Sequence, residues 1–197
     1  GTGAFTGMVF AVQTVHSFRL FNAETLVGST VALALFRELS PVLTSLMVTG
    51  RVGSAMATEL GTMRVTEQVD ALYSMAVNPV QYLVTPRIVA SIIMLPVLTI
   101  FCNIVGIIGA YYVAVSLMNV DRGMFIDKII FYVDGYDIAS GMIKSSFFGL
   151  ILSLTGCYKG INAEGGARGV GLATTQAVVY SSVIILISDY FLTIFLF

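Results

Sequence analysis

The sequence predicts an all-α membrane protein with five transmembrane helices, and its composition and its long apolar runs are the observations behind that prediction. Of its 197 residues, 57% are hydrophobic and only 11% are charged, and the mean hydropathy is +0.92. A soluble domain carries about 25% charged residues. Residues 88–118 contain no charged residue, although about 20 apolar residues are enough to cross a bilayer. We therefore expect the chain to cross a membrane several times.

The first two predicted helices occupy residues 1–16 and 26–58, with a polar turn between them. The first is shorter than the roughly 20 residues of a full span, and the chain begins with glycine rather than methionine. We therefore expect the sequence to be truncated within this helix. The second helix is longer than a span requires, and we expect a tilt or a bend near Pro41, because proline removes a helical hydrogen bond.

A short amphipathic helix is predicted at residues 63–76, between the second and third spans. One side of this helix would carry the apolar side chains Val65, Val69, Leu72 and Ala76. The other side would carry the polar side chains Arg64, Glu67, Asp70 and Ser74. A segment of this kind lies outside the membrane rather than across it. We expect it to end at Asn78-Pro79, which is a turn signal.

The third span is predicted at residues 88–118, after a connector at residues 78–84. Thr85 is its expected N-cap and Pro86 its first helical position. A short apolar segment at residues 124–133 follows a polar turn. It is too short to cross a bilayer, so we expect it to lie along the membrane surface or to pack on the other helices.

The fourth and fifth spans are predicted at residues 138–158 and 172–197, and Asp137 is the expected cap of the fourth. A glycine-rich polar loop at residues 159–171 joins them. This loop lacks the lysine that follows the glycines of a phosphate-binding loop. We therefore do not expect it to bind a nucleotide.

Four charged residues are predicted to lie at membrane depth, where a charge is costly unless it is paired or hydrated. Arg37 and Glu38 are adjacent and point about 100° apart on a helix, so each needs another partner. That partner lies across a dimer or in a lipid cavity, or else the pair only locks helices together. Lys144 either extends to the membrane interface or pairs with Glu38 or Asp189. Asp189 must itself be paired or protonated.

An apolar wall of a lipid pathway is the second candidate site, and its residues recur at helical spacing after Glu38. They are Leu39, Val42, Leu43, Leu46 and Met47. A buried helix face has the same pattern, so the spacing leaves both interpretations open.

Composition and motifs argue against a catalytic, metal or nucleic-acid site. The net charge is −1 and the chain has two cysteines, Cys102 and Cys157, which lie in different apolar runs without metal-ligand spacing. No Walker A sequence occurs. We expect no catalytic residue and no metal, and any ATP that drives this protein must be hydrolysed by another chain.

The stretch RELSPVLTSLMVTGRVGSAMATELGTMRVTEQVDALYSMAVNPVQYLVTPR resembles the signature of the MlaE/YrbE permeases. These are the membrane subunits of ABC transporters that work with Mce-domain proteins. The resemblance continues through LPVLTIFCNIVGIIGA, IKSSFFGLILSLTGCYKG and GVGLATTQAVVYSSVIILISDYFLTIFLF, and so covers essentially the whole chain. It implies one permease domain, residues 1–197, without the interfacial helix that begins other members of the family.

The resemblance also implies a function and a set of partners. Members of the family form homodimers in the bacterial inner membrane or the chloroplast inner envelope. They move phospholipids between the inner membrane and the outer envelope, and so maintain lipid asymmetry. Each dimer binds cytoplasmic ATPases that carry the ATP and magnesium, a hexameric ring of Mce-domain protein on the far side and, in several systems, a STAS-domain protein. No cofactor is expected on this chain itself.

Site residues follow from the same resemblance. Arg37 and Glu38 match the family's Arg-Glu pair, so we expect them to line a lipid pathway near the dimer axis. Residues 63–76 correspond to the cytoplasmic coupling helix that contacts the ATPase. The expected contacts are Glu59, Arg64, Glu67 and Asp70, although charges of this kind are equally typical of a solvated helix face.

Two functions from other classes remain as alternatives. A secondary carrier would use Asp189 or Glu38 as a proton site, and it would show an internal repeat with broken helices; the sequence shows no such repeat. An assembly subunit that only anchors other proteins would leave the charges at Arg37 and Glu38 without a purpose.

Overall fold

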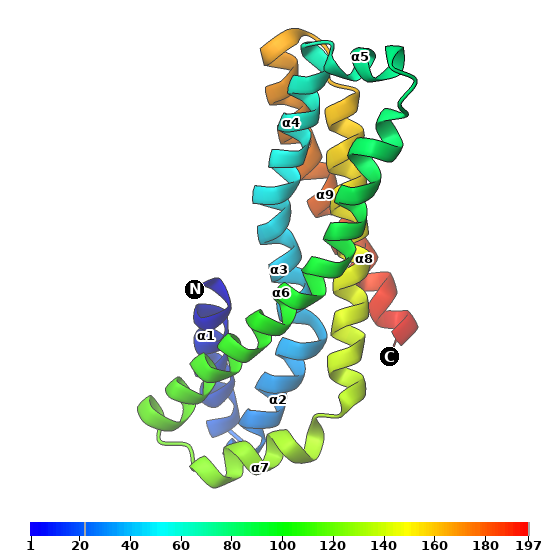
Figure 1. The fold of residues 1–197 in the computed structure, drawn as a ribbon. Helices are drawn as coiled ribbons and strands as arrows, with labels where there is room; N and C mark the ends of the chain where they lie inside the picture. Colours follow the sequence, from blue (N-terminus) through cyan, green and yellow to red (C-terminus); the bar gives the residue numbers. More distant parts are fainter. Residues whose placement is uncertain (22, 197) are drawn as a thin grey trace. The chain divides into compact units, whose positions relative to one another are not determined.

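The computed structural model describes residues 1–21 and 23–196, and this part of the chain is helical with no strand (Figure 1). It divides into two compact units. Unit 1 comprises Gly1–Thr44 and Pro96–Ile143, and unit 2 comprises Ser45–Leu95 and Lys144–Phe197. Three helices, α3, α6 and α8, continue from one unit into the other. The predicted all-α class is confirmed.

Unit 1 is built on close packing of its first helix against the end of α6. Its elements are α1 (Thr2–Arg19), η1 (Glu24–Leu26), α2 (Val27–Ala34), η2 (Leu35–Leu39), η5 (Tyr112–Leu117), α7 (Arg122–Tyr132) and parts of α3 (Ser40–Val48), α6 (Thr85–Tyr111) and α8 (Gly135–Ile161). A Cβ atom added to Gly7 on α1 would collide with the backbone of Gly106 on α6. Val31, Leu35 and Phe125 fill the core between these helices and α7. Glycine therefore sets the distance between α1 and α6.

In unit 2, the connection between α4 and α5 and the connection between α8 and α9 lie at the same end. Its elements are η3 (Thr49–Gly53), α4 (Ser54–Val65), α5 (Gln68–Ser74), η4 (Val80–Val84), α9 (Gly166–Leu196) and the remaining parts of α3, α6 and α8. A Cβ atom on Gly61, near the end of α4, would lie 3.3 Å from side-chain atoms of Ala163 and Val170. The turn between α8 and α9 therefore lies beside the end of α4 that leads to α5 (Figure 1).

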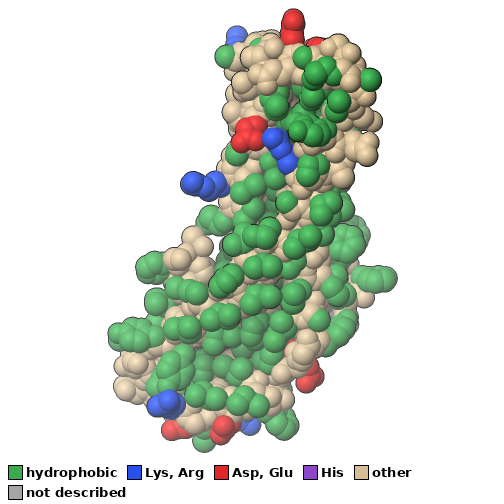
Figure 2. All heavy atoms as spheres, in the orientation of Figure 1, with side chains coloured by type: hydrophobic (Ala, Val, Ile, Leu, Met, Phe, Trp, Pro, Cys, Tyr) green, Lys and Arg blue, Asp and Glu red, His purple; other side chains and the backbone are tan. Residues whose placement is uncertain are grey.

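Four helical stretches in the described chain are long and apolar enough to cross a membrane. They are Glu24–Val65, Val80–Leu117, Gly135–Ile161 and Gly166–Leu196. On the face drawn in Figure 2, hydrophobic side chains predominate over charged ones in both units. Helix α1, with 18 residues, does not belong to this set, so a fifth span stays a prediction.

The predicted helix at residues 63–76 is wrong as a single element. Helix α4 continues from the span as far as Val65, and α5 begins separately at Gln68. Between them Glu67 adopts a left-handed backbone with φ 60°, a conformation that interrupts a right-handed helix. A second left-handed residue, Ala76, follows α5. The periodicity of the side chains did not reveal these two breaks.

The connector predicted at residues 78–84 is also wrong, because the helix containing α6 begins earlier. The Asn78 side chain accepts a hydrogen bond from the Val80 N–H at 3.0 Å, and Pro79 occupies the first helical position. Asn78-Pro79 is thus the cap and first residue that the sequence analysis assigned to Thr85-Pro86. The loop predicted at residues 159–171 is likewise shorter, since α8 ends at Ile161 and α9 begins at Gly166.

The irregularity expected near Pro41 takes the form of a π-helical turn. Segment η2 ends at Leu39, two residues before Pro41, and η4 ends at Val84, two residues before Pro86. A proline in a regular helix would remove one hydrogen bond and collide with a carbonyl of the preceding turn. The wider π turn accommodates both defects while the helix continues.

We expect Gly7→Val to lower the free energy of unfolding by about 1–3 kcal/mol, because the added side chain overpacks the contact with Gly106. Thermal unfolding of the protein in detergent measures this. The matched control is Gly171→Ala on α9, where an added Cβ atom meets nothing within 4 Å; it should leave stability unchanged or raise it slightly. Equal unfolding temperatures for Gly7→Val and the wild type would contradict the close packing of α1 and α6.

Candidate functional site

An ion pair in unit 1 holds the π-helical turn η2 to the first turn of α8. The Arg37 Nε and Nη2 atoms lie 2.7 Å and 2.6 Å from Oδ1 of Asp137. The Asp137 side chain is 3% exposed and that of Arg37 is 37% exposed. A buried carboxylate requires such a partner. The structure thus pairs Arg37 with a residue 100 positions away, a partner that the sequence analysis did not identify.

The predicted capping role of Asp137 is confirmed, but from a different position. Helix α8 begins at Gly135 rather than at residue 138, so Asp137 lies inside the first turn and its carboxylate reaches back to the residue before the helix. Its Oδ2 atom accepts a hydrogen bond from the Asp134 N–H at 3.0 Å. One carboxylate thus closes the start of α8 and binds Arg37 at the same time.

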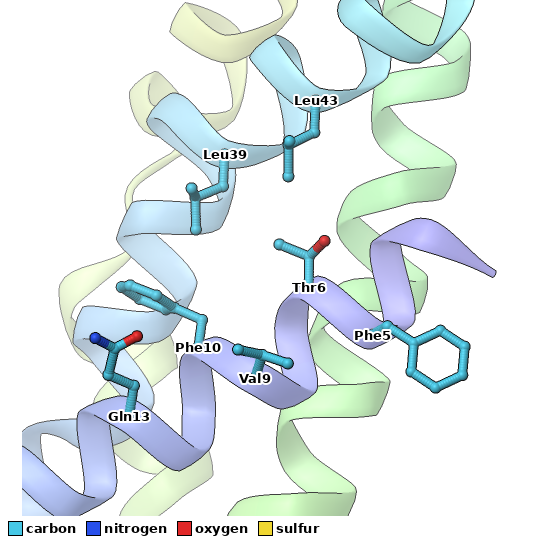
Figure 3. A pocket seen from close by; sticks show the side chains of 7 residues that line it. All are labelled: Phe5, Thr6, Val9, Phe10, Gln13, Leu39 and Leu43. Carbon is cyan, nitrogen blue, oxygen red and sulfur yellow. The ribbon is translucent and has the colours of Figure 1, made fainter.

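An apolar groove of about 400 Å³ lies beside η2 in unit 1. Figure 3 shows Leu39 and Leu43 pointing toward α1, and Thr6 and Phe10 pointing back toward them, whereas Phe5 points away. The full lining is Phe5, Thr6, Val9, Phe10, Gln13, Leu39 and Leu43. Grooves of this size and composition suit a small apolar ligand or part of a larger one.

The predicted apolar wall is reproduced only in part by this groove. Leu39 and Leu43 line it, whereas Val42, Leu46 and Met47 do not belong to its described lining. Met47 is 56% exposed. The contribution of α1 was missed, although Thr6, Phe10 and Gln13 recur at helical spacing and could have indicated it.

A second ion pair joins α8 to α9 in unit 2. Lys144 is fully buried, and its Nζ atom lies 3.4 Å from Oδ1 of Asp189. The same ammonium group donates a hydrogen bond to the Thr193 hydroxyl at 2.7 Å. The structure confirms the pairing of Lys144 with Asp189 and contradicts extension of the side chain to the membrane interface.

The four predicted coupling residues lie at the α5 end of unit 2. Arg64 and Asp70 form an ion pair at 2.5 Å, which spans the break between α4 and α5. Glu59 and Arg87 form another at 2.9 Å. Glu67 is exposed at the left-handed position between the two helices.

Helix α5 also presents apolar side chains that the analysis of charges overlooked. Val69 is 2% exposed and anchors α5 to its own unit, whereas Tyr73 and Met75 are 59% and 63% exposed. Exposed aromatic and methionine side chains are typical of the centres of protein interfaces. The α5 end therefore combines charges with an apolar surface that a partner protein could cover.

Residues 1–195 match the protein family described as Permease MlaE. The chain belongs to the MlaE permease family. The resemblance noted in the sequence is thereby confirmed.

Relatives of this MlaE-family permease support the same assignment. A "Probable ABC transporter permease protein" of Rickettsia felis is 46% identical over 192 residues, which cover 98% of this chain and 74% of the relative. A protein of the same description from Synechocystis is 43% identical and is matched over 100% of this chain and 74% of the relative. The Arabidopsis thaliana protein TRIGALACTOSYLDIACYLGLYCEROL 1, chloroplastic, is also 43% identical, over 100% of this chain and 56% of the relative.

Membership in the family determines the class of the chain. It is a membrane-spanning permease subunit rather than an enzyme, and an ABC transporter permease implies an ATPase partner. The groove and the ion pairs described above are therefore parts of a transport protein.

We expect Lys144→Ala to lower the free energy of unfolding by about 3–5 kcal/mol, because it removes the fully buried ammonium group that pairs with the Asp189 carboxylate. The double variant Lys144→Met with Asp189→Leu removes both charges and should recover most of that loss. Thermal unfolding in detergent compares the two. Additive losses in the double variant would show that the ion pair does not account for the effect.

Proposed function

We propose that this permease moves phospholipids between the inner membrane and the outer envelope, driven by ATP hydrolysis on a separate subunit. Membership in the MlaE permease family is the observation that carries the proposal. The name of the Arabidopsis relative, which is that of a galactolipid, favours a lipid as the cargo.

The groove in unit 1 supports a lipid substrate physically. Its lining is apolar apart from Thr6 and Gln13, which suits contact with a hydrocarbon chain. The turn that carries Arg37 and Glu38 also carries Leu39, which lines the groove. In the proposed mechanism the groove holds acyl chain while Arg37 and Glu38 provide charge beside the lipid pathway.

The α5 end supports coupling to an ATPase. The α8–α9 turn lies at this end of unit 2 (Figure 1), so two connections between helices are available to one partner. In the proposed assembly, α5 is the coupling helix and α1 belongs to a fifth span. The remaining partners are a second copy of the chain, an Mce-domain ring, a STAS-domain protein and the bacterial inner membrane or the chloroplast inner envelope.

Purification of the permease together with its ATPase, followed by reconstitution in vesicles, tests this function. ATP-dependent movement of a fluorescent phospholipid between two membranes is the expected result. A complex that hydrolyses ATP and moves no lipid would leave an anchoring role, and movement driven by a proton gradient without ATP would indicate a secondary carrier.

We expect Glu38→Ala to reduce lipid transport by about tenfold, because it removes a charge beside the pathway whose interactions are worth roughly 1.4 kcal/mol. The permease should still assemble. Glu24→Ala in the same unit removes an exposed carboxylate that pairs with Arg19, and serves as the matched control. Normal transport by Glu38→Ala would exclude this residue from the pathway.

We expect Glu67→Lys to uncouple ATP hydrolysis from transport, because charge reversal on the exposed surface near α5 opposes docking of the ATPase. The ATPase activity stimulated by the permease should fall by about tenfold for each 1.4 kcal/mol of lost binding. Asp127→Lys on α7 makes the same change on the surface of unit 1 and should have no effect. Wild-type stimulation by Glu67→Lys would argue against α5 as the coupling helix.

A further inference from the structure

Arg51 is a cation in a membrane-spanning helix for which the described chain provides no partner. It lies in η3, inside the candidate span Glu24–Val65, and its side chain is exposed. The other basic residues deep in the spans are Arg37, which pairs with Asp137, and Lys144, which pairs with Asp189. Among the described residues, none forms an ion pair or a side-chain hydrogen bond with the Arg51 guanidinium. A cation at such a depth must be paired or hydrated, and the described residues supply no counter-charge for it.

The helix around Arg51 leaves room for a large group to approach. An added Cβ atom on Gly50 would meet nothing within 4 Å. The Ser54 hydroxyl turns back to donate to the carbonyl oxygens of Gly50 and Arg51, at 2.7 Å and 2.9 Å. The segment is a π-helical turn, a feature that is frequent at functional sites. The guanidinium is thus the main polar donor presented by this exposed turn.

The depth of Arg51 can be judged from the Glu59–Arg87 ion pair, which marks a polar level of unit 2. Beyond Arg87, residues 88–118 carry no charge. Arg51 precedes Glu59 by eight residues, which is about 12 Å along a helix. The headgroup layer is only about 5–8 Å thick on each side of the hydrocarbon core. Arg51 therefore lies near the inner edge of that layer or just inside the hydrocarbon.

The direction of the side chain also matters. Helical side chains lean toward the N-terminus of their helix, and for Arg51 that direction leads away from Glu59 and deeper into the membrane. An anion bound there therefore lies deeper in the membrane than the Glu59–Arg87 ion pair. Because guanidinium groups bind phosphate with paired, charge-assisted hydrogen bonds, a phospholipid headgroup is the anion that fits.

We propose that Arg51 binds the phosphate of a phospholipid that has left the headgroup layer on the α5 side of the membrane. This inference rests on the proposed lipid transport, and it names the group of the substrate that the permease recognises. Arg51 then acts as a headgroup-binding residue, in addition to the residues named by the sequence analysis.

Native mass spectrometry of the permease–ATPase complex, released from nanodiscs, tests this binding. The nanodiscs contain equal amounts of phosphatidylglycerol and monogalactosyldiacylglycerol with the same acyl chains, and only the first carries a phosphate. The wild-type complex should retain phosphatidylglycerol preferentially. Arg51→Gln should lower that preference by about tenfold, the equivalent of a charge-assisted hydrogen bond of roughly 1.4 kcal/mol, and Arg51→Lys should keep most of it.

Arg168→Gln, which removes an exposed arginine near the start of α9, is the matched control and should retain the wild-type preference. An unchanged preference in Arg51→Gln would overturn the inference. Loss of the permease dimer from the spectra of Arg51→Gln would also overturn it, because the arginine would then bind a second copy of the chain. Transport is measured separately: a wild-type complex that retains phosphatidylglycerol but moves no lipid would refute the proposed function and leave the phosphate site in place.

Discussion

The structure depends on the requirement that charges within a membrane be neutralised. Two buried groups on α8 illustrate it. Asp137, near the start of this helix, binds Arg37 in unit 1, and Lys144, two turns later, binds Asp189 in unit 2. In a medium of low dielectric constant an unpaired charge at either position would be costly. Each pair thus ties α8 to a different helix, one in each unit.

Close approach of backbones supports the same helix along its length. A Cβ atom added to Gly141 would collide with the backbone of Phe36, and one added to Gly149 would lie 2.6 Å from the carbonyl oxygen of Ser91. Farther along, Gly160 lies against Ala57 in the same manner. Small residues allow this packing, and dispersion contacts between close helices replace the hydrophobic effect, which is absent within a bilayer. Helix α8 therefore combines ion pairs with glycine contacts.

The π-helical turns connect this packing to the proposed function. Segment η2 contains Arg37 and Glu38 and borders the apolar groove, and η3 contains Arg51. A π turn inserts an extra residue and so changes which side chains face the neighbouring helices. In η2 it directs Arg37 to Asp137 while Leu39 remains at the groove. The proposed lipid contacts thus lie where the helix departs from regular geometry.

The sequence by itself determined the helical class, the membrane location and the family. Long uncharged runs such as residues 88–118 leave few alternatives, because backbone groups in a bilayer must form hydrogen bonds within helices or closed barrels. The motif around Arg37 and Glu38 was specific enough to indicate the MlaE family. The ends of the helices were harder to predict from the sequence. The left-handed backbone of Glu67 and the early helix start at Asn78-Pro79 depend on local backbone conformation, which the periodicity of side chains does not reveal.

Only the tertiary structure decided which residues meet. Asp137 is 100 positions from Arg37, and the sequence left three interpretations open for Lys144. Positions along the chain could therefore not identify either ion pair. The groove required α1 and α3 to lie together, which brought Phe10 to Leu39 and left Met47 exposed. The structure was also needed to identify Arg51, because the absence of a partner among the described residues can be seen only when the positions of its neighbours are known. The physical reason is that pairing and burial depend on contacts between helices, and a sequence specifies these only through the fold.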